Sequence, residues 1–312
     1  MANISSAFLQ RALTLRHLRL LIALEDLGQV GRVAAALSIS QPAVSKALAE
    51  IESGVGVALF ERTPRGMVPT AHGACLLRYA HMMSNELGRA VDELTGIERG
   101  IAATLTVGAT AGAGTGYLLN AAILQARQRL PDMTVTVSEG LRDHLLRQLR
   151  TGRLDLMVGA ALDSTVPDDL DCTPLYIDAL AIVCGMRHAL AAKRKPDWAA
   201  LVIEAWVLPP RSTRVRAAIE ALFRRSGSAR PRLLAETLSL DLILELLAQG
   251  GALAVLPQHL ARRLAVAGQV RALEVDTPGL VMPVAVFTRA GAPLSTAGDS
   301  FRNYLVEAAA LR

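Results

Sequence analysis

The stretch from Val33 to Leu48 constrains the fold of this chain more than any other part of the sequence. Two adjacent alanines, beginning at Ala34, allow a second helix to cross closely. Ser40 is a good N-cap, and Pro42 falls at a helix start, where its missing N–H costs little. From Ala43 onward, apolar residues recur at spacings of three and four, which predicts a helix with one buried face. The stretch therefore predicts two short helices joined by a tight turn.

The segments on either side complete a winged helix-turn-helix over residues 13–70. Gly54 and Gly56 are expected to break the chain after the last helix, and short apolar strands are expected at 58–60 and 67–69. Residues 1–12 have weak periodicity and are expected to form a loose tail. The predicted helices span 15–28, 29–37 and 41–52.

The predicted helix 41–52 has a polar face opposite its apolar residues. This face begins with small polar groups, which suits the major groove of double-stranded DNA. A glutamine such as Gln41 can form two hydrogen bonds to adenine, and a serine such as Ser45 can form a hydrogen bond with several of the bases. For Lys46, a contact with a base and a contact with a phosphate are equally expected. The two wing arginines are expected to reach phosphates or the minor groove, with a solvated turn as the alternative. The predicted DNA contacts are Arg32, Ser40, Gln41, Pro42, Ala43, Ser45, Lys46, Arg62 and Arg65.

The charge of this region adds little to the argument. Residues 1–72 hold seven Lys or Arg and five Asp or Glu, a net of +2, within a chain whose formal net charge is +5. That balance is too weak to indicate nucleic-acid binding, so the inference rests on pattern and placement.

A long helix is predicted over residues 71–98, with Thr70 as its N-cap. Its apolar residues are spaced three and four apart, close to the seam of a coiled coil. The alternative is an ordinary helix packed on its own domain. We favour dimerisation, because the helix is long, is charged off the stripe and leads into another domain. The predicted dimerisation residues are Leu76, Ala80, Met83, Leu87, Val91 and Leu94.

Strand and helix patterns alternate through residues 102–312, which predicts an α/β domain with a mostly parallel sheet. One continuous sheet is an alternative, but the recurrence of strand and helix units after about residue 174 favours two lobes. Lobe I is expected to take residues 102–173 and 279–312, and lobe II residues 174–278.

Polar residues follow several predicted strands of this domain, where ligands of open α/β sheets bind. Each Ser or Thr there has a competing role as a helix N-cap. Their convergence on one cleft would suit a carboxylate or a polar, hydroxylated effector. The predicted effector-binding residues are Thr110, Ala111, Gly112, Ser138, Gly140, Arg211, Ser212, Thr213, Thr237 and Ser239.

The composition is that of a globular chain, with 52% hydrophobic and 20% charged residues. No apolar run reaches about 18 residues, so neither a transmembrane helix nor a membrane partner is expected. The three cysteines are odd in number and far apart, which disfavours a disulfide framework or zinc ribbon and fits a reducing cytoplasm. They are Cys75, Cys172 and Cys184.

Motifs of common enzyme classes are missing from the sequence. Tyr117 stands where a dinucleotide-binding G-x-G-x-x-G would need its third glycine after Gly112 and Gly114. The sequence contains neither a P-loop nor a nucleophile elbow, and its six histidines are scattered. No catalytic residue, metal or cofactor is therefore expected.

The sequence resembles the LysR-type transcriptional regulators over nearly its whole length. The matching segments are 15–18, 34–35, Ser40 to Lys46, 51–52, Leu59 to Gly66, 70–73, 105–108, 152–156 and 253–257. Residues 206–210 with Glu236 and Thr237 look closest to the subgroup named for a galactose-binding-protein regulator. Two departures are Gln29, where members often carry a serine cap, and Gly31, an unusual helix residue.

The resemblance implies a winged helix-turn-helix, a linker helix that pairs two subunits and a periplasmic-binding-protein-like effector domain. It also implies a homotetramer built as a dimer of dimers, a small metabolite as effector, and a switch acting on RNA polymerase. The alternative reading is a solute-binding or small-molecule enzyme domain whose N-terminal helices serve only assembly.

Overall fold

The structure is a computed structural model that describes residues 5–64, 66–99, 103–110, 116–161, 166–193, 195–227 and 230–311. It divides into two compact units, which are described separately. The first comprises Met1–Thr104 and Arg147–Leu154, and the second comprises Leu105–Leu146 and Asp155–Arg312. Within the described ranges, none of the helices is both long enough and apolar enough to cross a membrane.

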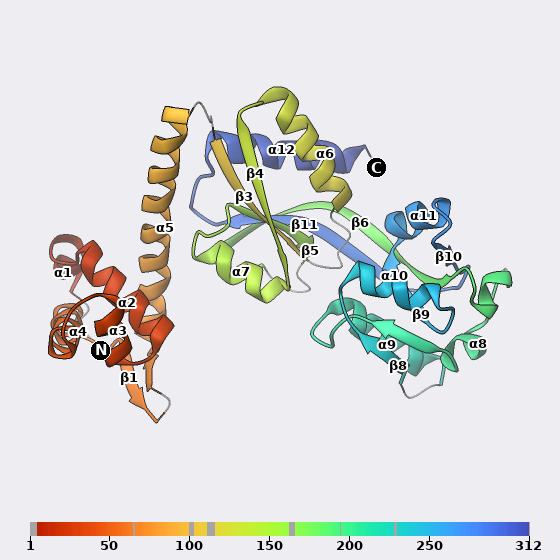
Figure 1. The fold of residues 1–312 in the computed structure, drawn as a ribbon, viewed down its shortest axis with the longest axis horizontal. Coiled ribbons are helices and arrows are strands. Elements are labelled where there is room, and N and C mark those ends of the chain that lie inside the picture. Colours follow the sequence, from red (N-terminus) through yellow and green to blue (C-terminus); the bar gives the residue numbers. More distant parts are fainter. Residues whose placement is uncertain are drawn as a thin grey trace. The chain divides into compact units, whose positions relative to one another are not determined.

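The first unit is a bundle of short helices followed by a two-stranded wing and a long helix (Figure 1). Thr14 begins the second helix with a capping box completed by His17, and Gly28 ends it in the left-handed conformation. Gln29, by contrast, makes no capping bond with any described residue. The elements are α1 (Ser6–Arg11), α2 (Leu15–Leu27), α3 (Val30–Ala36), α4 (Gln41–Val55), β1 (Phe60–Thr63), β2 (Gly66–Pro69) and α5 (Ala71–Arg99).

The N-terminal segment corrects two of the sequence predictions. Residues 1–12 were expected to form a loose tail, but α1 forms there and Phe8 packs against the unit's core. A Cβ on Gly54 would lie 2.3 Å from the Phe8 ring, so this glycine makes room for the ring inside α4 and does not break the helix. Gly56, at φ 88°, is the residue that ends α4.

The second unit is built on a nine-stranded sheet in which strands β6 and β11 are shared by two halves (Figure 1). The strand order is β4-β3-β5-β11-β6-β9-β7-β8, with β10 also paired to β6. The strands are β3 (Ala103–Thr110), β4 (Met133–Gly140), β5 (Leu156–Ala160), β6 (Leu170–Gly185), β7 (Ala205–Leu208), β8 (Arg232–Glu236), β9 (Leu253–Pro257), β10 (Val270–Ala272) and β11 (Val281–Arg289).

The predicted parallel pairing is present, and two long antiparallel strands join the halves. β3 is parallel to β5, and β7 is parallel to both β8 and β9. β11 pairs antiparallel with β5 and with the first part of β6, whose last part pairs antiparallel with β9. β6 therefore runs across the predicted lobe boundary between residues 173 and 174.

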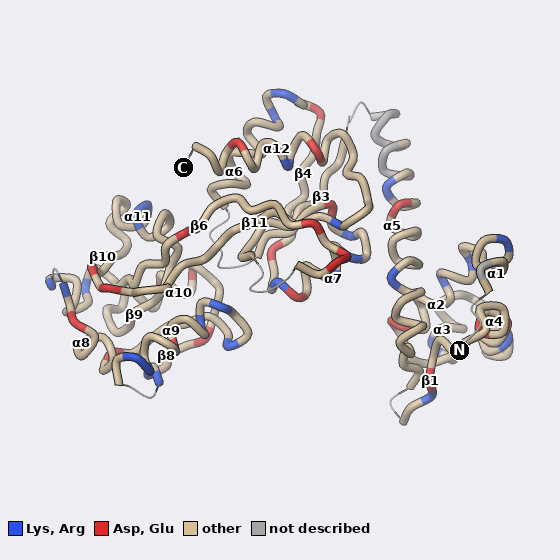
Figure 2. Tube along the Cα trace, turned by 180° about the vertical axis from the view of Figure 1, so that it is seen from behind, with Lys and Arg blue, Asp and Glu red and all other residues tan. Residues whose placement is uncertain are grey.

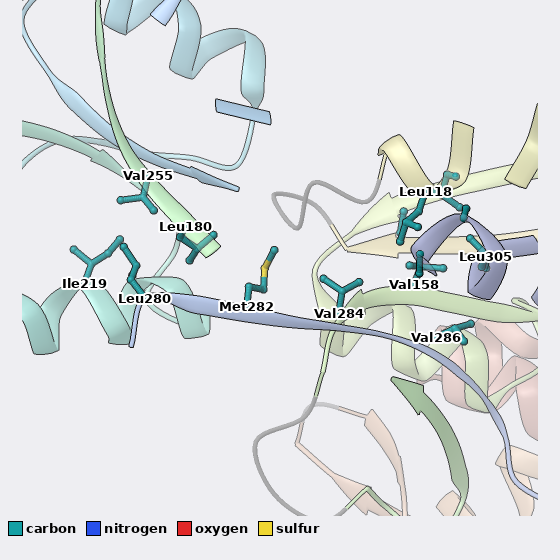
Figure 3. Packing of buried hydrophobic residues seen from close by; sticks show 14 of the residues in the cluster. Leu118, Val158, Leu180, Ile219, Val255, Leu280, Met282, Val284, Val286 and Leu305 are labelled. Carbon is teal, nitrogen blue, oxygen red and sulfur yellow. The ribbon is translucent and has the colours of Figure 1, made fainter. Parts of the chain in front are cut away.

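Helices cover this sheet, and α6 lies beside α12 (Figure 1). Figure 3 shows Leu118, Val158 and Leu305 gathered in one half and Leu180, Ile219 and Val255 in the other. All six belong to one continuous apolar core. The helical elements are α6 (Gly116–Arg129), α7 (Arg142–Arg150), η1 (Ala189–Ala192), α8 (Trp198–Val202), α9 (Arg214–Arg225), α10 (Leu240–Ala248), α11 (Gln258–Val266) and α12 (Thr296–Ala310).

Candidate functional site

The N-terminal half of α4 presents a polar face to solvent. Ser40 caps the helix by accepting the N–H of Ala43 at 3.3 Å, as predicted. Val44, Leu48 and Ile51 are buried on the other side of the helix. The predicted contacts Arg32, Ser40, Gln41, Pro42, Ser45, Lys46 and Arg62 are exposed, and Ala43 is half-buried. Arg65 lies outside the described residues.

Gly31 has a specific role beside this face. An ideal Cβ at Gly31 would lie 3.1 Å from Nε2 of Gln41, so the glycine lets the Gln41 amide lie across α3. The sequence pattern marked Gly31 as unusual but did not reveal this contact. The glycine thus keeps space for one of the predicted base-contacting groups.

A hollow of about 240 Å³ separates α4 from the wing. Ser45, Ala49 and Glu52 line it from α4, and Arg62 lines it from β1. The wing is fixed at its other strand, because the N–H of Met67 donates to the Gly28 carbonyl at 2.7 Å. Figure 2 shows both basic and acidic positions in this unit, in agreement with its small net charge.

Glu52 links the end of α4 to the start of the wing. Its Oε1 accepts the N–H groups of Leu59, at 2.7 Å, and Phe60, at 3.1 Å. Two backbone donors that would otherwise lack a partner are thereby satisfied. Glu52 is a positioning residue that sequence analysis missed, since an acidic residue on a helix usually indicates a solvated face.

We expect Glu52→Ala to lower the free energy of unfolding by about 1–3 kcal/mol, because it leaves two partly buried N–H groups unpaired. Urea unfolding followed by circular dichroism measures this change. Glu50→Ala is the matched control, because Glu50 is exposed and its ion pair with Lys46 is long, at 3.8 Å. Equal effects of the two substitutions would contradict the role given to Glu52.

The long helix α5 begins inside the first unit and then presents an apolar face to solvent. Thr70 caps it by accepting the Gly73 N–H. Leu76 and Ala80 pack within this unit. This part of α5 therefore matches the alternative prediction of an ordinary helix packed on its own domain. The other four predicted dimerisation residues are exposed: Met83 by 50%, Leu87 by 45%, Val91 by 61% and Leu94 by 65%. Tyr79, exposed by 49%, was missed by the sequence prediction and lies one turn before Met83.

In the second unit, Thr110 stands out among the predicted effector residues. It is the last residue of β3 and is only 8% exposed, yet its hydroxyl has no hydrogen-bond partner among the described residues. An ideal Cβ at Gly159 would lie 2.2 Å from Thr110 Oγ1, so Gly159 of the neighbouring strand β5 leaves the room that this side chain occupies. A buried polar group without a partner is costly, and ligand-binding sites are one place where such a cost is retained.

Three of the other predicted effector residues have structural partners. Thr213 and Ser239 cap α9 and α10, and the Thr237 hydroxyl accepts the Ser239 N–H. The bonds of Thr213 and Ser239 match the capping alternative considered for these residues. Arg211 and Ser212 are exposed, while Ser138 and Gly140 are half-buried in β4. Ala111 and Gly112 lie outside the described residues.

Two arginines at the start of α9 were missed by the sequence prediction. Arg214 Nη1 donates to the Ala161 carbonyl at 2.9 Å, so a residue of the β7–β8 half contacts the end of β5 in the other half. Arg216 is buried and binds Glu220, Glu236 and the Pro209 carbonyl. Arginines in a helix usually indicate a solvated face, so only the fold reveals these contacts.

Redox and metal chemistry receive no support from the described residues. All three cysteines are free, and burial raises the pKa of the Cys184 thiol to about 11. That thiol is therefore protonated and a poor nucleophile at neutral pH. Within the described ranges, no three His, Cys, Asp or Glu side chains are grouped so as to hold a metal ion.

Comparison with known proteins decides the family. Residues 15–74 match the model described as bacterial regulatory helix-turn-helix protein, lysR family, and residues 98–310 match the LysR substrate binding domain. The chain belongs to the LysR family. It is a LysR-type DNA-binding transcriptional regulator with a C-terminal effector-binding domain.

Named relatives agree with this assignment. The regulator GbpR of Azospirillum brasilense is 31% identical over 92% of this chain and 84% of its own length. The regulator TfdS of Cupriavidus pinatubonensis is 33% identical over 79% of this chain and 83% of its own length. Both relatives are transcriptional regulators.

Solved structures share the fold. Full-length OxyR from Pseudomonas aeruginosa is 24% identical, with a TM-score of 0.64 and 95% of both chains covered. Full-length CbnR in complex with its target DNA is 19% identical, with a TM-score of 0.63, covering 95% of this chain and 100% of that one.

Proposed function

We propose that this LysR-family regulator reads its operator with Gln41, Ser45 and Lys46 of α4, while Arg62 and Arg65 of the wing contact the DNA backbone or minor groove. The observation that supports this assignment is the exposed polar start of α4, which is held against a buried apolar face and lies beside the wing. Arg32, Ser40, Pro42 and Ala43 complete the proposed surface. A helix of this kind fits the major groove.

The experiment is fluorescence anisotropy with DNA from the region upstream of the protein's own gene, at fixed salt, against a shuffled sequence of equal length. We expect a specific complex that Gln41→Ala weakens by about 10-fold or more, since a bidentate base contact contributes about 1–3 kcal/mol. Equal affinity of the wild type for both DNAs would overturn the proposal for this region of DNA.

We further propose three functional segments: a DNA-binding domain at 13–70, a linker helix at 71–98 and an effector domain at 102–312, with lobes I and II as predicted. The exposed apolar residues of α5 would pair two subunits, and two such dimers would form a tetramer. The regulator would act in the cytoplasm and change RNA polymerase recruitment when its effector binds. A ligand does this only by binding one conformation more tightly than the other.

The proposed effector is a carboxylate or a sugar-like metabolite that binds near Thr110. The support is the buried Thr110 hydroxyl, which no other described residue satisfies. A thermal-shift screen of sugars, sugar acids and aromatic acids tests the class, because a ligand that binds only the native state raises the melting temperature. A screen without any such shift would count against these classes.

We expect Thr110→Val to leave DNA affinity and stability nearly unchanged, because the hydroxyl makes no hydrogen bond to any residue that the structure describes. The same substitution should lower the affinity for the effector found in that screen by about fivefold. This factor corresponds to the loss of one hydrogen bond of about 1 kcal/mol. Isothermal titration of both proteins measures the ratio. Thr237→Val serves as a comparison, since the Thr237 hydroxyl is already engaged by the Ser239 N–H.

A further inference from the structure

Helix α1 lies outside the part of the chain that the helix-turn-helix family model matches. That model begins at residue 15, whereas α1 takes Ser6–Arg11. Apolar side chains of this segment nevertheless pack on the core of the first unit: Phe8 and Leu9 from the helix, and Leu13 from the turn that follows it. The segment is therefore part of the folded first unit although it precedes the matched domain.

α1 contacts α4 at the end of α4 that lies away from the proposed reading residues. The Ser5 N–H donates at 3.2 Å to the Val55 carbonyl, one of the last carbonyls of α4, which lack a partner inside the helix. The Phe8 ring packs on Gly54, since the three atoms nearest to an ideal Cβ there all belong to that ring and lie closer than 3.0 Å. Glu52 joins the same turn of α4 to the wing. This end of α4 is thus held by α1 as well as by the wing.

The direction of α4 decides where its reading end lies. Gln41 and Gly54 are about 20 Å apart along the helix axis, at about 1.5 Å per residue. A tilt of about 5° at one end therefore moves the other end by about 2 Å. A hydrogen bond to a base tolerates less, because N–H···O distances span only about 2.7–3.2 Å. A weaker hold on the Gly54 end consequently disturbs base contacts before it disturbs the fold.

We propose that α1 positions the reading helix, with Phe8 as the positioning residue. Its ring, seated on Gly54, fixes the direction of α4 and so places Gln41 and Ser45 against the base edges. Gly54 is accordingly the socket for this ring. This inference rests on the proposed reading of the operator by α4 and adds to it a segment that precedes the matched domain.

The packing of α1 on α4 is tested by hydrogen exchange in the full-length protein, followed for residues 41–56 and corrected for intrinsic rates. Alanine in place of a helical glycine usually stabilises a protein. Here we expect Gly54→Ala to speed exchange about fivefold or more, because the new Cβ displaces the Phe8 ring. In a Phe8→Ala background that obstacle is gone, so Gly54→Ala should slow exchange about two- to fivefold. An effect of the same sign and size in both backgrounds would overturn the proposal.

The positioning itself is tested with operator DNA and shuffled DNA, at a temperature where circular dichroism shows each variant folded. We expect Phe8→Ala to lower operator affinity about tenfold, as for one lost base contact, and to change affinity for shuffled DNA less than about twofold. Phe8→Leu keeps an apolar side chain over Gly54 and should recover most of the operator affinity. Gln10→Ala, at an exposed position of α1, is the matched control and should bind as the wild type does.

Gln41→Ala, measured in parallel, separates the two proposals. If Gln41→Ala weakens operator binding and folded Phe8→Ala does not, α1 has only a structural role and the positioning proposal is wrong, while reading by α4 stands. If neither substitution weakens it, reading by α4 fails and the positioning fails with it. Should Phe8→Ala fold poorly, Gly54→Ala takes its place, since it displaces the ring without removing it, and the same tenfold loss is expected.

Discussion

A Leu87→Glu, Val91→Glu double variant will dissociate to monomers and bind operator DNA about 100-fold more weakly than the wild type. Both side chains are exposed on the described face of α5, in line with Met83 and Leu94. A helix with a broad exposed apolar stripe gains stability by burying it against a partner, and charges in that seam oppose the burial. Two linked DNA-binding domains reach their half-sites with a raised effective concentration, which monomers lack.

Light scattering coupled to size-exclusion chromatography measures the mass, and anisotropy measures the affinity. The control variant Ala74→Glu, Gly88→Glu adds the same charges at exposed positions away from the stripe, and a Cβ at Gly88 would meet nothing within 4 Å. We expect the control to keep the wild-type mass. A Leu87→Glu, Val91→Glu protein of wild-type mass would rule out this face as the subunit contact.

Ser45→Arg will reduce the distinction between operator and unrelated DNA while leaving non-specific binding intact or stronger. Ser45 is exposed on α4 and borders the hollow beside Arg62. An arginine there is too long for the close approach that a serine allows and adds a charge that contacts any phosphate. The ratio of specific to non-specific affinity should fall by about 10- to 100-fold, as for the loss of one base contact.

Ser53→Arg provides the comparison, since Ser53 is also an exposed serine of α4 but lies near the helix's other end. Competition assays at two salt concentrations separate the specific from the electrostatic contribution. If Ser53→Arg lowered the ratio as much as Ser45→Arg does, added charge would explain the result, and α4 would lose its place as the reading helix.

The sequence was enough to predict those helices whose ends are set by a capping residue or a glycine within the segment itself. Ser40 caps α4 and Gly28 ends α2, as the sequence indicated. The missed features depend on contacts distant in sequence. The six residues of α1 give too short a pattern to detect, and its anchor, Phe8, packs on Gly54 of α4. Helix α11 follows β9 directly, with Pro257 at its N-cap position but without a side-chain capping bond to any described residue.

The candidate sites show the same division. The polar face of α4 follows from helical periodicity, so it was predictable residue by residue. For the effector site, a hydroxyl after a strand has two competing roles, and sequence cannot separate them. Thr213 and Ser239 are occupied as caps, whereas the Thr110 hydroxyl has no hydrogen-bond partner in the described part of the chain. The hydrogen bond from Arg214 to the Ala161 carbonyl joins residues far apart in the sequence, and alanine has no side-chain chemistry that could have marked it.

The nine-stranded sheet narrows to the pair β6 and β11 between its two halves, and this has a mechanical consequence. β5 pairs with β11 only from Val284 onward, and β9 pairs with β6 only from Leu180 onward. Between these points the ladder consists of two strands, with Asp178 opposite Met282. Strands held by a continuous ladder resist sliding, but a ribbon of two strands twists more readily than a wide sheet. Torsion of this two-stranded ribbon would therefore rotate one half of the unit against the other.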